Sequence, residues 1–548
     1  MIKLRKSPPW RVLGVAALLV FGGGISYWVL ARKPSENAAV VGSRLVPQDA
    51  LMAVSVSTAP DRWQQLDRYG TPDSQKLFQD RLTQLQDRLL KESGYNYRAD
   101  IQPWVGDRIT VALLPPSPIT PDRPTEADKI QVDFATVFVL PVKNLNRARQ
   151  LANGEETAPA WTERTYKGIT IRERESDEMH YSMALVDRNF VVVTTDPVAI
   201  DRAIDAYKQN ASIASMPGYN RAWSNLNVAN PFIYAFVNVP AALESAAETS
   251  TRSIDVEALA NVETQGIATA VTLENDGIRL QSLSWLDSDS QTTFDVEGNS
   301  PPTTIDRLPA ETQLAIAGSN LNRIWQDYLQ NAQANPLLPL DVGWLRTALQ
   351  QTVGIDLDSE LLSWMTGEFA FAIVPTLDEE DVMFPQALVL MVQVGDRNAA
   401  ESFFRKLDRA VAEKYEFNIE EREVEGFPVV HWDTRRKGLD VSHGWVDNGV
   451  AFFSVGVPVT SRLLPQPSES LARTSLFQEV VPRQPDPSNG LFFVNLTDSQ
   501  GETNLFLPRF PDDRQAIVDA IDSIGVRAGI LDERSSRYDI FVKISSEK

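Results

Sequence analysis

Alternating and helical patterns of hydrophobic residues recur along the chain and predict antiparallel sheets with packed helices. Apolar residues at helical spacing predict an amphipathic helix at 74–92 and a second helix at 196–208. Short apolar or alternating segments bounded by turn residues predict strands. These segments are 50–57, 108–114, 134–142, 169–174, 181–187, 189–195, 231–239, 266–274 and 278–286. Because short turns such as Asn275-Asp276-Gly277 join consecutive strands, the predicted fold class is α+β.

One hydrophobic run differs from all the others because it carries no charge. Residues 12–31 are twenty uncharged residues, and a helix of that length covers about 30 Å of hydrocarbon. More basic residues precede the run than follow it, which predicts a transmembrane helix with a cytoplasmic basic tail at 1–11 and an exported remainder. A signal peptide cleaved after Ala31 is the alternative. The polar segment 32–45 is interpreted as a tether.

The chain also resembles itself. Residues 94–115 match residues 354–375 without a gap, and further blocks before and after them recur in the same order in both halves. The pattern predicts two tandem similar domains at 46–286 and 305–548, joined by a polar linker at 287–304. The positions expected to anchor both repeats are Gly94, Trp104, Pro115, Gly354, Trp364 and Pro375. A tryptophan at a repeated position is more often a core anchor than a stacking platform for a ligand.

The opening LVPQDALMAVSVST at 45–58, the N-terminal apolar run and the length of 548 residues resemble a known family. It is an uncharacterised cyanobacterial family of single-anchor membrane proteins, catalogued only as a domain of unknown function. The resemblance implies a photosynthetic bacterium and a plasma or thylakoid membrane, with the bulk of the chain in the periplasm or the thylakoid lumen. It transfers no catalytic residue to this sequence.

Charge and cysteine content exclude several functions. The chain has 73 acidic and 52 basic residues, for a net charge of −21, and such a surface repels phosphate backbones. We therefore expect no nucleic-acid partner. The sequence has 0 cysteines, which excludes disulfides, thiolate nucleophiles and cysteine-held metal centres. No cofactor motif appears, and we expect none.

Candidate chemistry is sparse. A metal or acid–base site would bring histidines together with carboxylates, and the chain has three, His180, His431 and His443. No histidine is shared by both repeats, so we interpret them as structural and expect no metal site. The acidic run at 378–381 is interpreted as a solvated loop. A serine triad stays open, because triads are recognised by geometry and not by sequence order.

Two functional classes remain from the sequence. The favoured one is a membrane-tethered extracytoplasmic scaffold, assembly or binding protein, whose expected partner is a membrane-associated protein complex. The alternative is an extracytoplasmic hydrolase with a dispersed site between the repeats, and no catalytic residue is assigned. The chemistry of the largest cleft discriminates between them: converging histidine, serine and carboxylate groups favour the enzyme, and an apolar groove favours a lipid or peptide binder.

Overall fold

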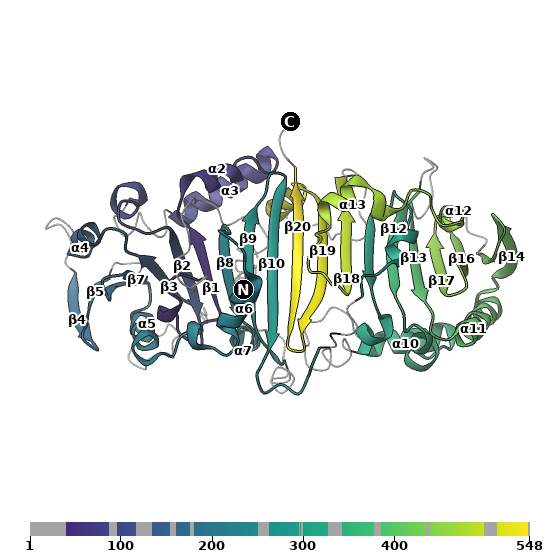
Figure 1. Ribbon diagram of the computed structural model, residues 1–548, viewed down its shortest axis with the longest axis horizontal. Helices are drawn as coiled ribbons and strands as arrows, with labels where there is room; N and C mark the ends of the chain where they lie inside the picture. Colours follow the sequence, from purple (N-terminus) through teal and green to yellow (C-terminus); the bar gives the residue numbers. More distant parts are fainter. Residues whose placement is uncertain are drawn as a thin grey trace, which may run out of the picture. The chain divides into compact units, whose positions relative to one another are not determined.

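The computed structural model of the chain contains two compact units (Figure 1). The first unit comprises residues 1–292, 507–520 and 544–548, and the second comprises residues 293–506 and 521–543. The structure describes residues 40–86, 96–116, 134–153, 161–175, 180–249, 262–294, 296, 300–326, 342–376, 385–434, 439–497 and 512–545.

The described strands of the first unit pair antiparallel in the order β4, β5, β6, β7, β3, β2, β1, β8, β9, β10. Their bounds are β1 (Met52–Ser57), β2 (Arg108–Leu114), β3 (Ala135–Pro141), β4 (Thr162–Tyr166), β5 (Ile169–Glu175), β6 (His180–Val186), β7 (Phe190–Thr194), β8 (Ile233–Asn238), β9 (Thr264–Leu273) and β10 (Gly277–Leu286).

Helix α5 (Pro197–Gln209) illustrates how the sequence sets helix ends in the first unit. The Asp196 carboxylate accepts hydrogen bonds from the backbone N–H groups of Val198 and Ala199, and Asn210 ends the helix in the left-handed conformation. The buried face of α5 packs into the core of the unit, which also includes Val40 and Leu45 from the segment interpreted as a tether. The other helices are α2 (Pro60–Leu66), α3 (Pro72–Gln86), α4 (Leu145–Asn153), α6 (Tyr219–Leu226), α7 (Val239–Thr249) and α14 (Asp512–Val518).

The second unit repeats this strand order. Its strands pair antiparallel in the order β14, β15, β16, β17, β13, β12, β11, β18, β19, β20. Their bounds are β11 (Leu314–Gly318), β12 (Phe369–Pro375), β13 (Gln386–Gln393), β14 (Asn418–Val424), β15 (Phe427–Asp433), β16 (Asp440–Trp445), β17 (Val450–Gly456), β18 (Gly490–Asn495), β19 (Ile521–Asp532) and β20 (Ser535–Ile544).

Helix α11 (Arg397–Tyr415) is the longest helix described in the second unit, and its residue Val411 packs in one core cluster with Trp432 of β15 and Val441 of β16. The Asp396 carboxylate accepts from the backbone N–H of Ala399 at its start, and Glu416 ends it in the left-handed conformation. Other helices among the described residues of this unit include α10 (Val342–Val353), α12 (Thr460–Leu463) and α13 (Ser475–Val480). Part of the unit's core forms between α11 and the sheet and includes Trp364, Phe404 and Val392.

Two parts of the predicted fold class are wrong. The prediction gave each of two similar domains its own sheet, whereas strands β1 to β20 are assigned to one antiparallel sheet of 20 strands. Strand patterns are local, so they carry no information on how far a sheet extends. The prediction also placed a transmembrane helix at 12–31, but no helix among the described residues is long and apolar enough to cross a bilayer. Residues 1–39, with the tail and the apolar run, lie outside the described part of the chain.

Candidate functional site

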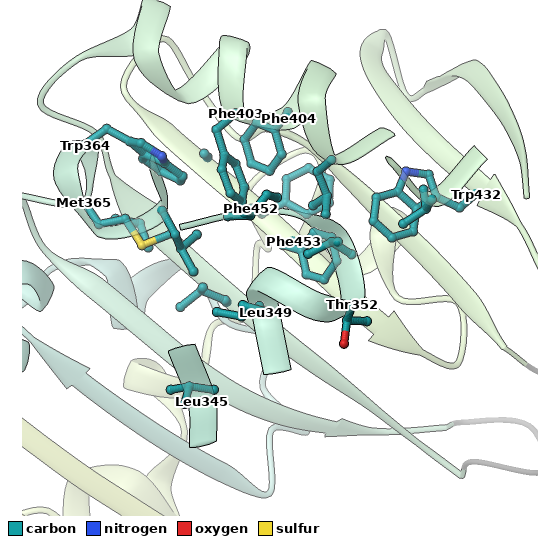
Figure 2. Close-up of a pocket in the computed structure, with 18 of the residues that line it drawn as sticks. Leu345, Leu349, Thr352, Trp364, Met365, Phe403, Phe404, Trp432, Phe452 and Phe453 are labelled. Atoms are coloured by element: carbon teal, nitrogen blue, oxygen red, sulfur yellow. The ribbon is translucent and has the colours of Figure 1, made fainter. Parts of the chain in front are cut away.

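The second unit contains a cavity of about 400 Å³ between two helices and the sheet (Figure 2). Helices α10 and α11 line two sides, and the short helical segment at 357–364 contributes at one end. Strands β13, β15 and β17 form the floor. The volume falls in the range typical of small-molecule sites, roughly 300–1,000 Å³.

The lining of the cavity is almost wholly apolar. On α11 the wall residues recur at helical spacing, so one stripe of the helix faces the cavity. Thr352 is the sole polar side chain among the lining residues, and it is exposed. The lining residues are Leu345, Ala348, Leu349, Thr352, Val353, Ile355, Leu361, Trp364, Met365, Leu390, Val392, Phe403, Phe404, Leu407, Val411, Trp432, Ala451, Phe452 and Phe453.

The polar groups of the aromatic walls are all directed away from the cavity into the protein. The indole N–H of Trp364 donates to the Glu360 carbonyl at 3.1 Å, and that of Trp432 donates to the Asp408 carboxylate at 2.7 Å. The same Asp408 oxygen lies 2.9 Å from Nε2 of His443. The buried imidazole of His443 stacks on the wall residue Phe404 at 4.4 Å between ring centroids. His443 is therefore a structural group behind the cavity wall.

Ion pairs outside the cavity hold its helices together. The Arg346 guanidinium on α10 lies 2.6 Å from the Asp358 carboxylate and lowers the pKa of that carboxyl group. Glu360 accepts from the backbone N–H of Asp356 and pairs with Lys406 on α11, and both contacts lower its pKa. These carboxylates make structural contacts between the elements around the cavity, and none of them lines it.

The predicted repeat anchors occupy structural positions. Trp104 and Trp364 are buried, and each indole N–H donates to the carbonyl four residues earlier, Asp100 at 2.6 Å and Glu360 at 3.1 Å. Trp364 also lines the cavity. The structure gives no sign of a stacking platform at Trp104, which packs within the core.

The other described anchors lie at the end of a helix or of a strand. The carbonyl of Pro115 accepts from the Arg202 guanidinium at 3.2 Å, and that of Pro375 accepts from Arg462 at 2.9 Å. Gly354 has φ +69, a conformation that favours glycine, and follows α10. Gly94 lies outside the described residues.

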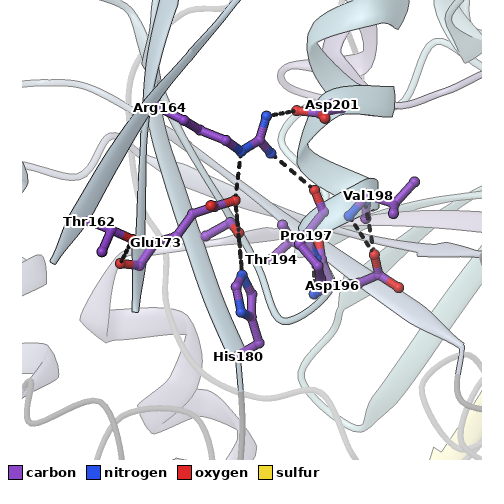
Figure 3. Close-up of polar contacts among 11 residues, drawn as sticks. Thr162, Arg164, Glu173, His180, Thr194, Asp196, Pro197, Val198 and Asp201 are labelled. Atoms are coloured by element: carbon purple, nitrogen blue, oxygen red, sulfur yellow. Dashed lines mark hydrogen bonds and ion pairs between the residues drawn. The ribbon is translucent and has the colours of Figure 1, made fainter. Parts of the chain in front are cut away.

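A second group of polar residues lies in the first unit on β5 and β6 (Figure 3). Nε2 of His180 lies 3.0 Å from the Ser182 hydroxyl, and that hydroxyl donates to the Glu173 carboxylate at 3.3 Å. Arg164 pairs with both Glu173 at 2.9 Å and Asp201 at 2.8 Å. Its contacts with these two carboxylates outweigh its desolvation and raise the pKa of Arg164.

The second unit carries the same three groups with two of them exchanged between strands. Ser442 pairs across the sheet with His431, as Ser182 pairs with Glu173. Nδ1 of His431 lies 3.3 Å from the Ser442 hydroxyl and 3.0 Å from the Asp440 carboxylate, and the Ser442 hydroxyl donates to Asp440 at 2.8 Å. Histidine and carboxylate have thus changed places around a common serine. Alignment of the repeats places His180 opposite Asp440 and His431 near Glu173, but it does not show that each histidine contacts a serine at an equivalent place in the sheet.

Neither group has the arrangement of a catalytic triad. A triad carboxylate orients the histidine through the ring nitrogen that does not face the serine. Here Glu173 lies 4.0 Å from Nε2 of His180, the nitrogen that already faces Ser182. The two serines are buried, at 0% exposure for Ser182 and 2% for Ser442. Within the described residues no three histidine or carboxylate groups converge as metal ligands, and the acidic run at 378–381 lies outside them.

Comparison with known proteins places the chain in a family. The family described as "Protein of unknown function (DUF3352)" matches residues 12–544. The chain belongs to this family. The predicted resemblance to a domain of unknown function is therefore confirmed, and the domain is DUF3352. No curated protein matches this DUF3352 chain.

Solved structures similar to this DUF3352 chain include three crystal forms of TP0453. Their sequence identities are 9–10% and their TM-scores 0.23–0.24, over 44–46% of this chain and 79–81% of TP0453. A likeness at that TM-score has no bearing on the function of the DUF3352 chain.

Sequence reasoning did not find the cavity. Its clearest signal was available in α11, where Phe403, Phe404, Leu407 and Val411 form an apolar stripe on a helix that was not predicted. That stripe indicates a helix packed on something apolar. It does not indicate that space remains between the helix and the sheet.

Proposed function

We propose that the second unit binds an apolar ligand, a hydrocarbon chain such as the acyl chain of a lipid, in the cavity between α10, α11 and the sheet. The observation that carries the proposal is the lining: eighteen of its nineteen side chains are apolar, and none is charged. Burial of hydrocarbon in such a space is favourable by roughly 25 cal/mol per Å² of apolar surface. In this proposal the protein acts as a binding protein, and no reaction takes place in the cavity.

The paired polar groups of the walls support a hydrocarbon over a polar ligand. A polar group buried without a partner costs about 1–3 kcal/mol. Because Trp364 and Trp432 donate their indole N–H groups to the protein, neither is available to a ligand in the cavity. A ligand segment that carries no donors or acceptors leaves nothing unsatisfied there.

Calorimetric titration of dodecanoic acid into the purified protein tests the proposal. We expect saturable binding of one molecule per chain with a negative heat-capacity change, because apolar surface is removed from water. A titration without saturation, or one with no heat-capacity change, would contradict the proposal. If apolar peptides saturate the site and dodecanoic acid does not, the ligand class is wrong.

The hydrolase alternative depends on two contacts, between His180 and Ser182 at 3.0 Å and between His431 and Ser442 at 3.3 Å. The buried serine and the position of Glu173 weigh against it. Replacing Ser182 or Ser442 by alanine is expected to leave the hydrolysis of p-nitrophenyl butyrate at the level of the unmodified protein, within about twofold. If either variant loses hydrolytic activity tenfold or more while its free energy of unfolding is unchanged, the result would favour the hydrolase.

We also propose an extracytoplasmic address in a cyanobacterium, either the periplasm or the thylakoid lumen. The lack of cysteine supports export, because an exported chain without thiols avoids mispairing in an oxidising compartment. A membrane-associated protein complex as partner remains a proposal as well. Co-purification of the tagged protein from its own membranes, compared with its soluble fraction, would identify such a partner.

A further inference from the structure

We infer that the cavity is one end of a longer site, and that an apolar strip on the sheet of the second unit takes the rest of the ligand. The strip consists of two cross-strand rows of side chains on β17, β13, β12, β11, β18 and β19. The inference rests on the proposed function and narrows its ligand class. It assigns a long-chain lipid to the site in place of a compact apolar molecule.

The first row of the strip follows directly from the strand register. Phe453 pairs with Leu390, Leu390 with Phe371, and Phe371 with Ile316. Ile316 pairs on its other side with Phe492, and Phe492 pairs with Val526. Directly paired residues of an antiparallel sheet point to the same face, so all six side chains share one face.

The second row lies two residues along each strand and is equally apolar. It consists of Val455, Leu388, Ile373, Leu314, Val494 and Ile524. Ile316 is 39% exposed and Leu388 is 37% exposed, and of the twelve side chains only Ile373 is buried. The other nine side chains are partly buried, so the strip is a contiguous apolar surface that is only partly covered. Apolar surface of this kind marks a binding site more often than a free surface.

The strip is continuous with the cavity. Leu390 and Phe453 belong to the first row and also line the cavity. From Leu390 the row crosses four more strands to Val526, a path of about 19 Å at the usual spacing of neighbouring strands. A ligand that fills the cavity and leaves over Leu390 therefore meets apolar side chains along that path.

The first unit shows that this exposure is not a general property of the fold. Val54 is the residue of the first unit that is equivalent to Ile316. It pairs with Val111 and Ala235 on the two neighbouring strands, as Ile316 pairs with Phe371 and Phe492. Val54 is 3% exposed and Ala235 is 2% exposed. At these two positions of the first unit the same face is buried, and the side chains Val54 and Ala235 are smaller than Ile316 and Phe492.

The chemistry of the strip favours hydrocarbon as its occupant. Each of its six strands is paired on both sides, so the backbone groups are engaged within the sheet. Neither row contains a polar or charged side chain. A protein partner would bring backbone groups that need hydrogen bonds, whereas a methylene chain needs none.

Titration with saturated fatty acids of increasing chain length tests the inference. Each methylene buried in the cavity is expected to improve affinity about fourfold, and each methylene that lies on the open strip about twofold. In the unmodified protein the gain therefore continues beyond the length that fills the cavity. In Ile316→Asp the short acids bind as before, and the gain stops at the length at which the chain passes Phe371 and reaches residue 316.

A matched control and three outcomes make the test decisive. Val198→Asp changes a residue of similar exposure in the first unit and should leave the whole series unchanged. If short acids bind but the gain stops at the same length with and without Ile316→Asp, the strip is refuted and the proposed function stands. If no acid binds, both fail. If Ile316→Asp converts a dimer to a monomer in sedimentation velocity, the strip is covered by a second copy of the chain and the inference is wrong.

Discussion

Replacing Trp364 by alanine is expected to lower the free energy of unfolding by about 3–5 kcal/mol. Trp364 is 3% exposed and packs on Phe403 and Phe404, with ring centroids 5.5 and 5.9 Å away. Removing the ring enlarges a space that is already present and leaves the Glu360 carbonyl without its donor. Urea unfolding followed by circular dichroism measures the loss.

Trp344 provides the control for this prediction, because it is the same residue type on α10 but 65% exposed. Trp344→Ala is expected to change the free energy of unfolding by no more than about 0.5 kcal/mol. Trp104→Ala should behave like Trp364→Ala, since Trp104 is 2% exposed and makes the same type of indole hydrogen bond. A loss below about 1 kcal/mol in Trp364→Ala would show that the repeated tryptophan is not a core anchor.

The second large effect is expected from filling the cavity. Ala348 on α10 lines the cavity, and Ala348→Phe places a ring where the ligand would lie. In the complex the ring and the ligand compete for the same space, and overpacking of this kind costs about 1–3 kcal/mol. Affinity for dodecanoic acid should therefore fall roughly tenfold to a hundredfold. The ligand-free protein should be as stable as before or up to about 1 kcal/mol more stable, because the ring occupies empty space.

Gln350→Phe is the matched control for cavity filling. It adds the same ring to the exposed side of the same helix and should leave the affinity unchanged. Calorimetry measures binding, and urea unfolding measures stability in the same samples. If Ala348→Phe binds dodecanoic acid as tightly as the unmodified protein does, the ligand lies elsewhere.

Local structure could be predicted from the sequence where the pattern is strong and bounded by turn residues. The helix predicted at 196–208 is α5 (Pro197–Gln209), and the strand predicted at 108–114 is β2 (Arg108–Leu114). In these segments the hydrophobic period and the flanking residues agree. Helix α11 is not among the predicted elements, although its apolar residues recur at helical spacing.

The extent of the sheet and the cavity could not be predicted. Both depend on how elements far apart in the sequence meet: the cavity joins Leu349 on α10 to Phe403 on α11 and Phe453 on β17. A residue that lines a cavity has the same hydrophobic signature as one that is fully packed. The sequence therefore predicts which residues are apolar and buried, but it does not predict that a cavity lies between them.

The histidines show a different limit of sequence reasoning. Alignment of the repeats found no shared histidine and led to a structural interpretation. In the structure His180 and His431 each contact a serine at an equivalent place in the sheet, but from different strands. Cross-strand register, which the sequence does not state, is what relates them.

The most direct test of the central claim is the location of a bound hydrocarbon. Crystals grown with 12-bromododecanoic acid give the position of the bromine from its anomalous scattering. We expect a bromine peak inside the cavity, bordered by Leu349, Phe403 and Phe453. A peak outside the second unit, or protein crystals saturated with the acid that show no peak in the cavity, would contradict it.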